Sequence, residues 1–64
     1  AAEEKLQRAI LSLPPKQQLV FRLRYYDEMP YDQMAALTGT SEGALKASYH
    51  HAVKKVTEEL QRSE

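Results

Sequence analysis

Hydrophobic residues recur every three or four positions along the second half of the chain. They are Leu45, Tyr49, Ala52, Val56 and Leu60, at steps of four, three, four and four. This spacing places them on one stripe of an α-helix, because a helix turns by about 100° per residue. We expect the stripe to pack inward and the helix to span about 41–61.

Two more helices are predicted in the first half of the chain. The inner stripe of the first one, over about 3–12, is formed by Leu6, Ala9, Ile10 and Leu13. This helix should end at the Pro14-Pro15 pair, because the residue before a proline avoids helical geometry. Pro15 can then open a second helix over about 15–27, since the first helical residue needs no N–H.

The second helix is apolar on two sides. Leu19, Leu23 and Tyr26 lie on one side with Val20 beside them, and Phe21 and Tyr25 lie nearly opposite. Such a helix is either sandwiched between neighbours or lends one side to a partner. The sandwich suits so small a chain, and Phe21 and Tyr25 would form the side offered to a protein partner.

A short third helix over about 31–37 is predicted to turn Met34 and Leu37 inward. Gly39 follows, where a helix C-terminus favours a left-handed residue. Thr40 or Ser41 can cap the next helix through a side-chain oxygen. The chain therefore stops, turns and restarts within about four residues, which is the pattern of a helix-turn-helix. We predict an all-α fold of four helices with a C-terminal helix-turn-helix and no wing, as one domain over 1–64, and this motif points to duplex DNA.

The last helix has an outward face that is small at its start and polar further along. Opposite Leu45 lie Gly43, Ala44, Ala47, His50, His51 and Lys54, and Lys46 lies on one flank. Small residues let a surface approach closely, and His and Lys can reach base edges or phosphates. These residues, with Ser41 at the helix start, are the predicted DNA-binding set.

Further phosphate contacts are predicted for Arg22, Arg24 and Thr40. A structural ion pair is an equally good explanation for the two arginines, and capping alone would explain Thr40 and Ser41. Lys54 could instead pair with Glu58 four residues later.

Charge and composition limit the remaining functions. The 64 residues carry nine basic and nine acidic side chains, and this zero net charge predicts weak DNA affinity for the isolated chain. Cysteine is absent, so neither a disulfide nor a thiolate metal site can form. The sequence contains no apolar run long enough for a membrane span and no signal-peptide pattern, so cytoplasmic localisation is the expectation.

Catalysis and metal binding have little support. The adjacent His50 and His51 point about 100° apart on a helix, and no third ligand lies nearby in the sequence. The chain lacks a cysteine nucleophile and a glycine-rich phosphate loop, and its carboxylates cluster at predicted helix ends. We expect no enzyme activity, no cofactor, no metal and no small-molecule substrate.

Residues 13–56 resemble region 4 of bacterial sigma factors, in particular the extracytoplasmic function group of the sigma-70 family. The matching pieces are, in order, Leu13-Pro14, Val20-Phe21-x-Leu23-Arg24, Pro30-Tyr31-Asp32-Gln33-Met34-Ala35, Gly39-x-Ser41 and Gly43-Ala44-Leu45-Lys46. The resemblance implies a domain that reads the −35 promoter element in the major groove. It also implies contacts with the β flap of RNA polymerase, an anti-sigma factor that masks the domain, and a longer factor of which this is the C-terminal part.

The sequence departs from the family pattern on the last helix. Many members have Lys-Ser-Arg-Leu-x-Arg-Ala where this chain has Lys46-Ala47-Ser48-Tyr49-His50-His51-Ala52, so the resemblance does not imply which bases are read. Two other interpretations remain open. One is a module that mainly binds an anti-sigma factor or a polymerase subunit. The other is the effector domain of a different regulator, such as a two-component response regulator.

Overall fold

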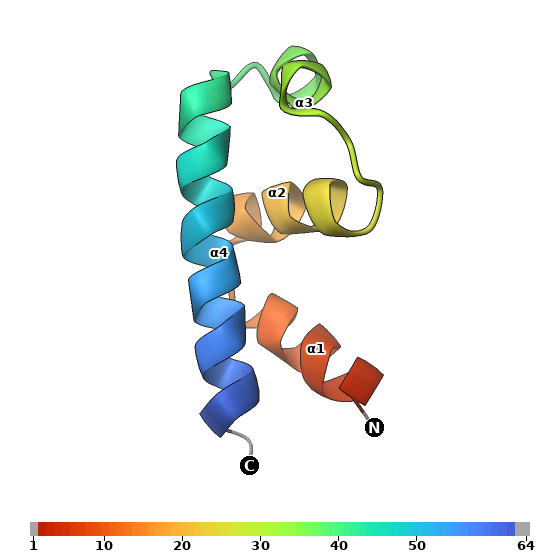
Figure 1. Cartoon of the computed structure of the whole chain (residues 1–64), viewed down its shortest axis with the longest axis vertical. Coiled ribbons are helices and arrows are strands. Elements are labelled where there is room, and N and C mark those ends of the chain that lie inside the picture. Colours follow the sequence, from red (N-terminus) through yellow and green to blue (C-terminus); the bar gives the residue numbers. More distant parts are fainter. Residues whose placement is uncertain (1, 63–64) are drawn as a thin grey trace.

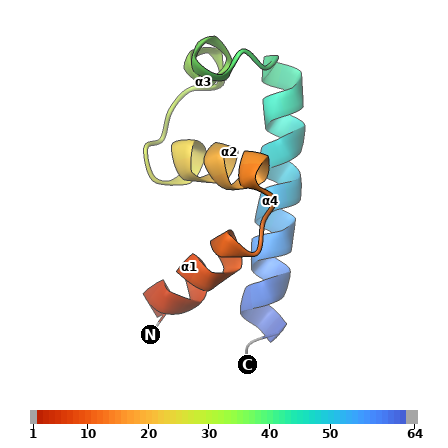
Figure 2. The ribbon, with the colours of Figure 1, turned by 180° about the vertical axis from the view of Figure 1, so that it is seen from behind.

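Three short helices pack along one side of a long fourth helix (Figure 1). The computed structural model describes residues 2–62, which form α1 (Ala2–Leu11), α2 (Pro15–Tyr25), α3 (Tyr31–Thr38) and α4 (Glu42–Arg62). Figure 2 shows the same order from behind, with α3, α2 and α1 following one another along α4. The all-α fold with a C-terminal helix-turn-helix is therefore confirmed. None of the four helices is long and apolar enough to cross a bilayer, within residues 2–62.

The α1–α2 junction is held by side chains as well as by the two prolines. The Ser12 hydroxyl donates to the carbonyl of Ala9 at 2.6 Å. The Gln18 amide donates to the carbonyl of Leu13 at 2.7 Å and more weakly to that of Leu11 at 3.3 Å. These bonds add acceptor contacts at the C-terminus of α1 and in the residues just after it, where carbonyls lack partners further along the helix. Pro15 is the first residue of α2, as the sequence predicted.

The chain leaves α2 through a tight loop. Glu28 has a positive φ of 51°, an uncommon conformation for a residue with a side chain. The Met29 amide donates back to the carbonyl of Leu23 at 3.1 Å, and Arg24 Nη1 donates to the carbonyl of Met29 at 3.1 Å. These two bonds fix the loop, so α2 ends at Tyr25, before the predicted residue 27.

The turn between α3 and α4 has the expected chemistry. Gly39 is left-handed, with φ 72°, and its N–H donates to the carbonyl of Ala35 at 2.9 Å. Ser41 caps α4, because its Oγ accepts from the Ala44 N–H at 3.2 Å. Thr40 does not cap α4, and its N–H donates to Thr38 Oγ1 at 3.3 Å.

Two hydrophobic clusters lie on either side of α2. The first joins α1, α2 and the second half of α4 and contains Ala9, Ile10, Leu13, Phe21, Ala52 and Val56. The second joins α2, α3 and the first half of α4 and contains Val20, Leu23, Met34 and Leu45. Tyr49 packs against both clusters. Helix α2 is therefore sandwiched, which is the interpretation that the chain length favoured.

This sandwich corrects the prediction that Phe21 belongs to an open partner face. Phe21 is 3% exposed, because it faces α1 and α4 while Val20 and Leu23 face the other cluster. Tyr25 remains half exposed, and its ring stacks on Phe21 with centroids 5.1 Å apart. A partner on this side could reach Tyr25 but not Phe21.

Leu37 was also predicted wrongly, since it is 65% exposed. The inward stripe of α3 is made of Tyr31, Met34, Ala35 and Thr38, which are the residues of this helix that are buried or half-buried. Leu37 lies just beyond the edge of this stripe. Leu19 is likewise 48% exposed, although the sequence grouped it with Leu23.

Candidate nucleic-acid interface

The first half of α4 presents a continuous exposed face. Leu45, which is 1% exposed, anchors this half of the helix against α2 and α3. All the residues predicted to lie opposite Leu45 are exposed to solvent: Gly43, Ala44, Ala47, His50, His51 and Lys54. Lys46 and Ser41 are exposed as well. The structure thus places the predicted set on one accessible surface, and their contact with DNA stays a prediction.

Packing within the chain does not require a glycine at position 43, at the start of this face. A Cβ atom added at Gly43 would meet no other group within 4 Å. Glycine in a helix costs roughly 0.5–1 kcal/mol relative to alanine. A residue that weakens the helix without filling a tight space is consistent with a surface that something else approaches closely.

Lys46 is held near the start of α3. Its Nζ lies 5.6 Å from the centroid of the Tyr31 ring. Arg24 Cζ lies 4.7 Å from the same centroid. Both distances are within the range of cation–π attraction.

Arg24 therefore has a structural role, but not the one expected. The sequence suggested a structural ion pair as the alternative to a phosphate contact, whereas the guanidinium contacts the Met29 carbonyl and the Tyr31 ring. Arg22 is half-buried, and its contact with phosphate stays a prediction. The sequence did not single out Tyr31 as a site residue. Its ring contacts Arg24 of α2 and Lys46 of α4, and residues on three different helices cannot be related by the spacing within one helix.

The ion pairs in the second half of α4 differ from the one that the sequence predicted. Lys55 Nζ lies 4.0 Å from Glu59 Oε1, and Arg62 Nη1 lies 3.3 Å from the same oxygen. The predicted Lys54–Glu58 pair is thus replaced by one that starts a residue later. Exposed pairs of this kind stabilise a helix by a few tenths of a kcal/mol at most.

The two histidines are exposed neighbours with ring centroids 6.0 Å apart. Within the described part of the chain, residues 2–62, no three His, Cys, Asp or Glu side chains gather in a way that could hold a metal ion. The site therefore offers hydrogen-bonding and charged groups on a surface whose other side chains are small. Such a surface suits a polymer of phosphates and base edges.

The family model described as Sigma-70, region 4 matches residues 3–56. The chain belongs to this family. The resemblance found in the sequence is therefore confirmed, and α3 and α4 are the helix-turn-helix of a sigma region 4.

Curated relatives of this region 4 carry one name. The chain is 37% identical over 65 residues to the RNA polymerase sigma-E factor of Streptomyces coelicolor, with 94% of the chain and 37% of the relative covered. It is 35% identical over 66 residues to the sigma-E factor of Streptomyces avermitilis, with 95% and 37% covered. The chain thus spans about 37% of the length of these relatives. No solved structure matches it significantly.

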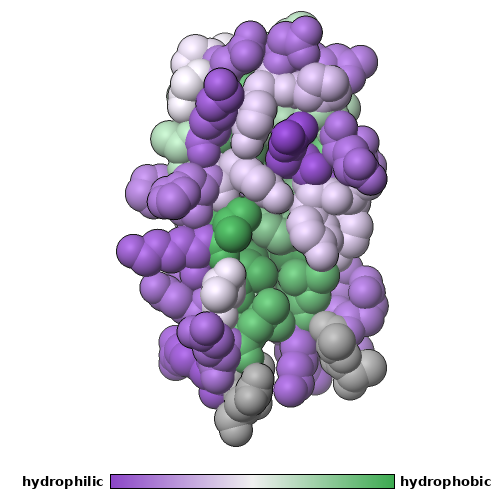
Figure 3. All heavy atoms as spheres, in the orientation of Figure 1, coloured by the Kyte–Doolittle hydropathy of each residue, from purple (hydrophilic) through white to green (hydrophobic). Residues whose placement is uncertain are grey.

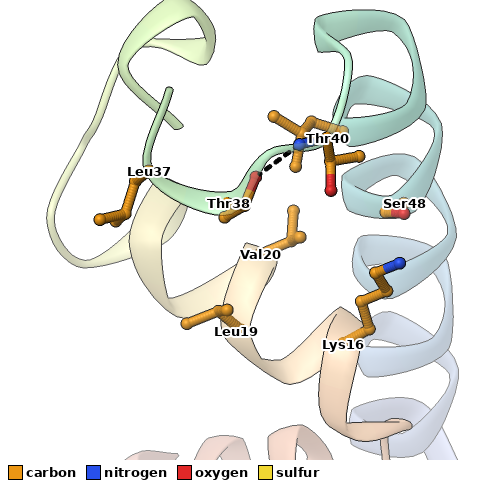
Figure 4. A pocket seen from close by; sticks show the side chains of 8 residues that line it. Lys16, Leu19, Val20, Leu37, Thr38, Thr40 and Ser48 are labelled. Carbon is orange, nitrogen blue, oxygen red and sulfur yellow. Dashed lines mark hydrogen bonds between the residues drawn. The ribbon is translucent and has the colours of Figure 1, made fainter. Parts of the chain in front are cut away.

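This region 4 also has a groove away from the exposed face of α4. The groove lies between α2, α3 and α4 and is lined by Lys16, Leu19, Val20, Leu37, Thr38, Thr40, Leu45 and Ser48. Figure 4 shows Leu19 and Leu37 on one side of it, and Lys16 and Ser48 on the other. The two exposed leucines were expected to be core residues, so sequence reasoning missed the groove.

A second apolar area is visible on the face shown in Figure 3. Hydrophobic residues gather there where α1 meets the lower half of α4, and polar residues surround them. Leu6 of α1 and Leu60 of α4 are partly buried and pack against the first cluster, which joins these two helices. This area is the edge of the first hydrophobic cluster.

Proposed function

We propose that this chain reads the −35 element of promoters, as the DNA-binding region 4 of an extracytoplasmic function sigma factor. The observation that carries the proposal is the exposed face of α4 opposite Leu45, small at Gly43 and polar from Lys46 onward. A helix of this kind fits the major groove, where each base pair shows a distinct pattern of donors and acceptors. Family membership supports the same role.

The residues of this face have different parts in the proposal. Gly43 and Ala44 allow the backbone to come close to the duplex. Ala47, His50 and His51 face base edges, and Lys54 extends the face along the groove. Lys46 contacts phosphate together with Ser41, whose hydroxyl already caps α4. Thr40 and Arg22 are weaker candidates for phosphate, since Thr40 lines the groove beside α2.

Neutral charge fits a domain that binds promoters only weakly when it is alone. Phosphate contacts supply most of the affinity of a DNA-binding protein, and this chain has no excess of positive charge. Linkage to a larger assembly can supply the missing affinity through effective concentration. The curated relatives are named RNA polymerase sigma-E factors, so RNA polymerase is the partner we propose. Action in the bacterial cytoplasm follows from these two partners.

The Leu19–Leu37 groove is the surface that we assign to the polymerase. Exposed leucines in a hollow are typical of a protein contact and not of a phosphate contact. The groove includes Leu45 and Ser48, whereas the DNA face lies on the opposite side of α4. Both partners can therefore be bound at once.

Selection from a random duplex library tests the DNA-binding part. The bound fraction is sequenced after equilibrium at low salt, and binding of the enriched duplex is followed by fluorescence anisotropy. One short motif should be enriched, and the double variant His50→Ala, His51→Ala should lose the preference for it. Thr57→Ala with Gln61→Ala, two exposed residues in the second half of α4, is the matched control. A folded chain that enriches no motif would contradict base reading by this chain alone.

A substitution that places a charge in the groove tests the polymerase contact. Leu37→Lys should weaken binding of the labelled chain to RNA polymerase core enzyme, because a lysine cannot occupy an apolar contact without loss of hydration. Leu11→Lys is the control, since Leu11 is 63% exposed and lies outside the groove. Equal weakening by both substitutions, or by neither, would reject the groove as the contact.

A further inference from the structure

Tyr31 lies where the three helices around the helix-turn-helix meet. It is the first residue of α3, and its ring lies 4.7 Å from Arg24 Cζ on α2 and 5.6 Å from Lys46 Nζ on α4. The ring also packs against the cluster formed by Val20, Leu23, Met34 and Leu45. One aromatic side chain thus links the core to two cations.

The two cations differ in how firmly they are held. Arg24 is half-buried and also donates from Nη1 to the carbonyl of Met29 at 3.1 Å. Lys46 is exposed, and the Tyr31 ring is the contact found for its ammonium group. Arg24 therefore fixes the ring from the α2 side, and the ring in turn restricts the position of Lys46.

Lys46 keeps its charge available in this arrangement. The ion pairs of the described residues involve Lys55 and Arg62 with Glu59, and not Lys46. A lysine has a flexible four-carbon stem and loses side-chain entropy when it binds a phosphate. A ring that already restricts the stem lowers this loss without neutralising the charge.

We propose that Tyr31 is a positioning residue for DNA binding, which holds the Lys46 ammonium on the α3 flank of α4 for contact with a backbone phosphate. Arg24 fixes the ring and adds a second positive charge beside it. The inference rests on the proposed function, because it requires that Lys46 contacts DNA. It assigns the role to the face of the Tyr31 ring and not to its hydroxyl.

A double-mutant cycle on the 64-residue chain tests this role. Tyr31→Leu removes the ring but keeps an apolar side chain against the second cluster, and Tyr31→Phe keeps the ring and removes the hydroxyl. Each substitution is made with Lys46 present and with Lys46→Ala. Affinity for one labelled duplex is measured by anisotropy at low salt, and thermal unfolding shows that every variant is folded.

Tyr31→Leu should weaken binding about threefold when Lys46 is present, since exposed cation–π contacts have that order of strength. The same change should have no effect in the Lys46→Ala background, and Tyr31→Phe should bind like the wild type. Equal loss in both backgrounds would overturn the proposal, because it would show that the ring supports only the fold. Unchanged binding in Tyr31→Leu would overturn it as well.

Failure of the proposed function gives a different result. In that case neither the wild-type chain nor Lys46→Ala binds a duplex. The Lys46 methylene protons then report the contact directly, since a ring face shifts their NMR signals upfield and Tyr31→Leu removes the shift. A shift without DNA binding would contradict the proposed function and leave Tyr31 as a contact of the fold alone. DNA binding without the shift would overturn the positioning role and leave the proposed function intact.

Discussion

In residues 42–50, the first half of α4, small side chains lie opposite the buried Leu45, and Lys46 on the flank takes no part in the ion pairs of the described residues. In residues 51–62, the exposed surface carries Lys55, Glu59 and Arg62 in an ion-paired group, and Ala52 and Val56 face α1. Both halves belong to one continuous helix with one hydrophobic stripe. The comparison shows that the hydrophobic stripe decides how the helix packs. The opposite face decides function: its first part is open to a ligand, and its last part carries charges that pair with one another.

The two halves also differ in the core beneath them. The first half packs on the cluster that includes Met34 of α3, and the second half packs on the cluster that includes Ile10 of α1. If the comparison is right, damage to either core should cost stability, but only damage beneath the first half should disturb DNA binding directly.

The largest expected effect is on stability, from Leu45→Ala. Leu45 is 1% exposed, and removing such a side chain typically costs about 2–5 kcal/mol. Ile10→Ala, at 0% exposure in the other cluster, should cost a similar amount. Urea unfolding measures both. Among molecules that remain folded, Leu45→Ala should weaken DNA binding more than Ile10→Ala, and the reverse order would break the comparison.

The next effect concerns the exposed face. Ala47→Glu places a negative charge on the face that we assign to DNA, and it should weaken duplex binding about tenfold through repulsion from phosphates. Thr57→Glu adds the same charge to the same helix, in its second half, and should have a much smaller effect. Anisotropy at low salt measures both variants. Similar losses would mean that net charge, and not the position on α4, controls binding.

Gly43→Ala should change stability and binding in opposite directions. The added Cβ meets nothing within 4 Å, so the helix should gain up to roughly 0.5 kcal/mol, less than in a helix interior because Gly43 is the second residue of α4. The same methyl group would stand between the helix and the duplex and weaken binding. Gly39→Ala should destabilise the chain instead, because Gly39 has a φ of 72°. Tighter DNA binding by Gly43→Ala would contradict close approach at this residue.

The smallest effect is expected at high pH, from Tyr49, which packs against both clusters. Burial raises the pKa of the Tyr49 phenol above its ordinary value, with a further contribution from Tyr31, while Arg24 acts in the opposite direction. The folded state therefore holds this proton more tightly than the unfolded chain does. The resulting stability is fully present below the unfolded pKa, about 10, and is lost as the pH rises through the raised folded value.

Tyr49→Phe isolates this contribution. Between about pH 8 and pH 11 the variant should lose less of its unfolding free energy than the wild type does, because it has no phenol to ionise. Unfolding in urea at the two pH values measures the difference. Identical losses in the two proteins would show that ionisation of Tyr49 is not coupled to folding.

The buried residues that the sequence predicted correctly are those that belong to a helical repeat sustained over many residues. Leu45, Ala52 and Val56 are buried, because a 21-residue helix determines its inward face from many positions. In the eight residues of α3, the two hydrophobic positions Met34 and Leu37 were not enough to determine the inward face, and Leu37 lies just outside it. Phe21 was ambiguous because α2 is apolar on both sides, and only the placement of α1 shows which side is covered.

The candidate site was predicted unevenly for the same reason. Residues on one helix, such as Gly43, Ala47 and His50, share a face by their spacing alone. The contact of Arg24, Tyr31 and Lys46 depends on how three helices cross, and the Leu19–Leu37 groove depends on the gap between α2 and α3. These relations are set by tertiary packing, which a single sequence does not show.

The central claim is that the exposed face of α4 from Gly43 to Lys54 contacts DNA and that the ion-paired surface beyond it does not. It is tested most directly by NMR titration of the ¹⁵N-labelled chain with the duplex selected from the random library. The account predicts that amide signals from Gly43 to His50 move most, with smaller changes beyond Lys55. Largest changes at Leu19 and Leu37, or along residues 55–62, would contradict it.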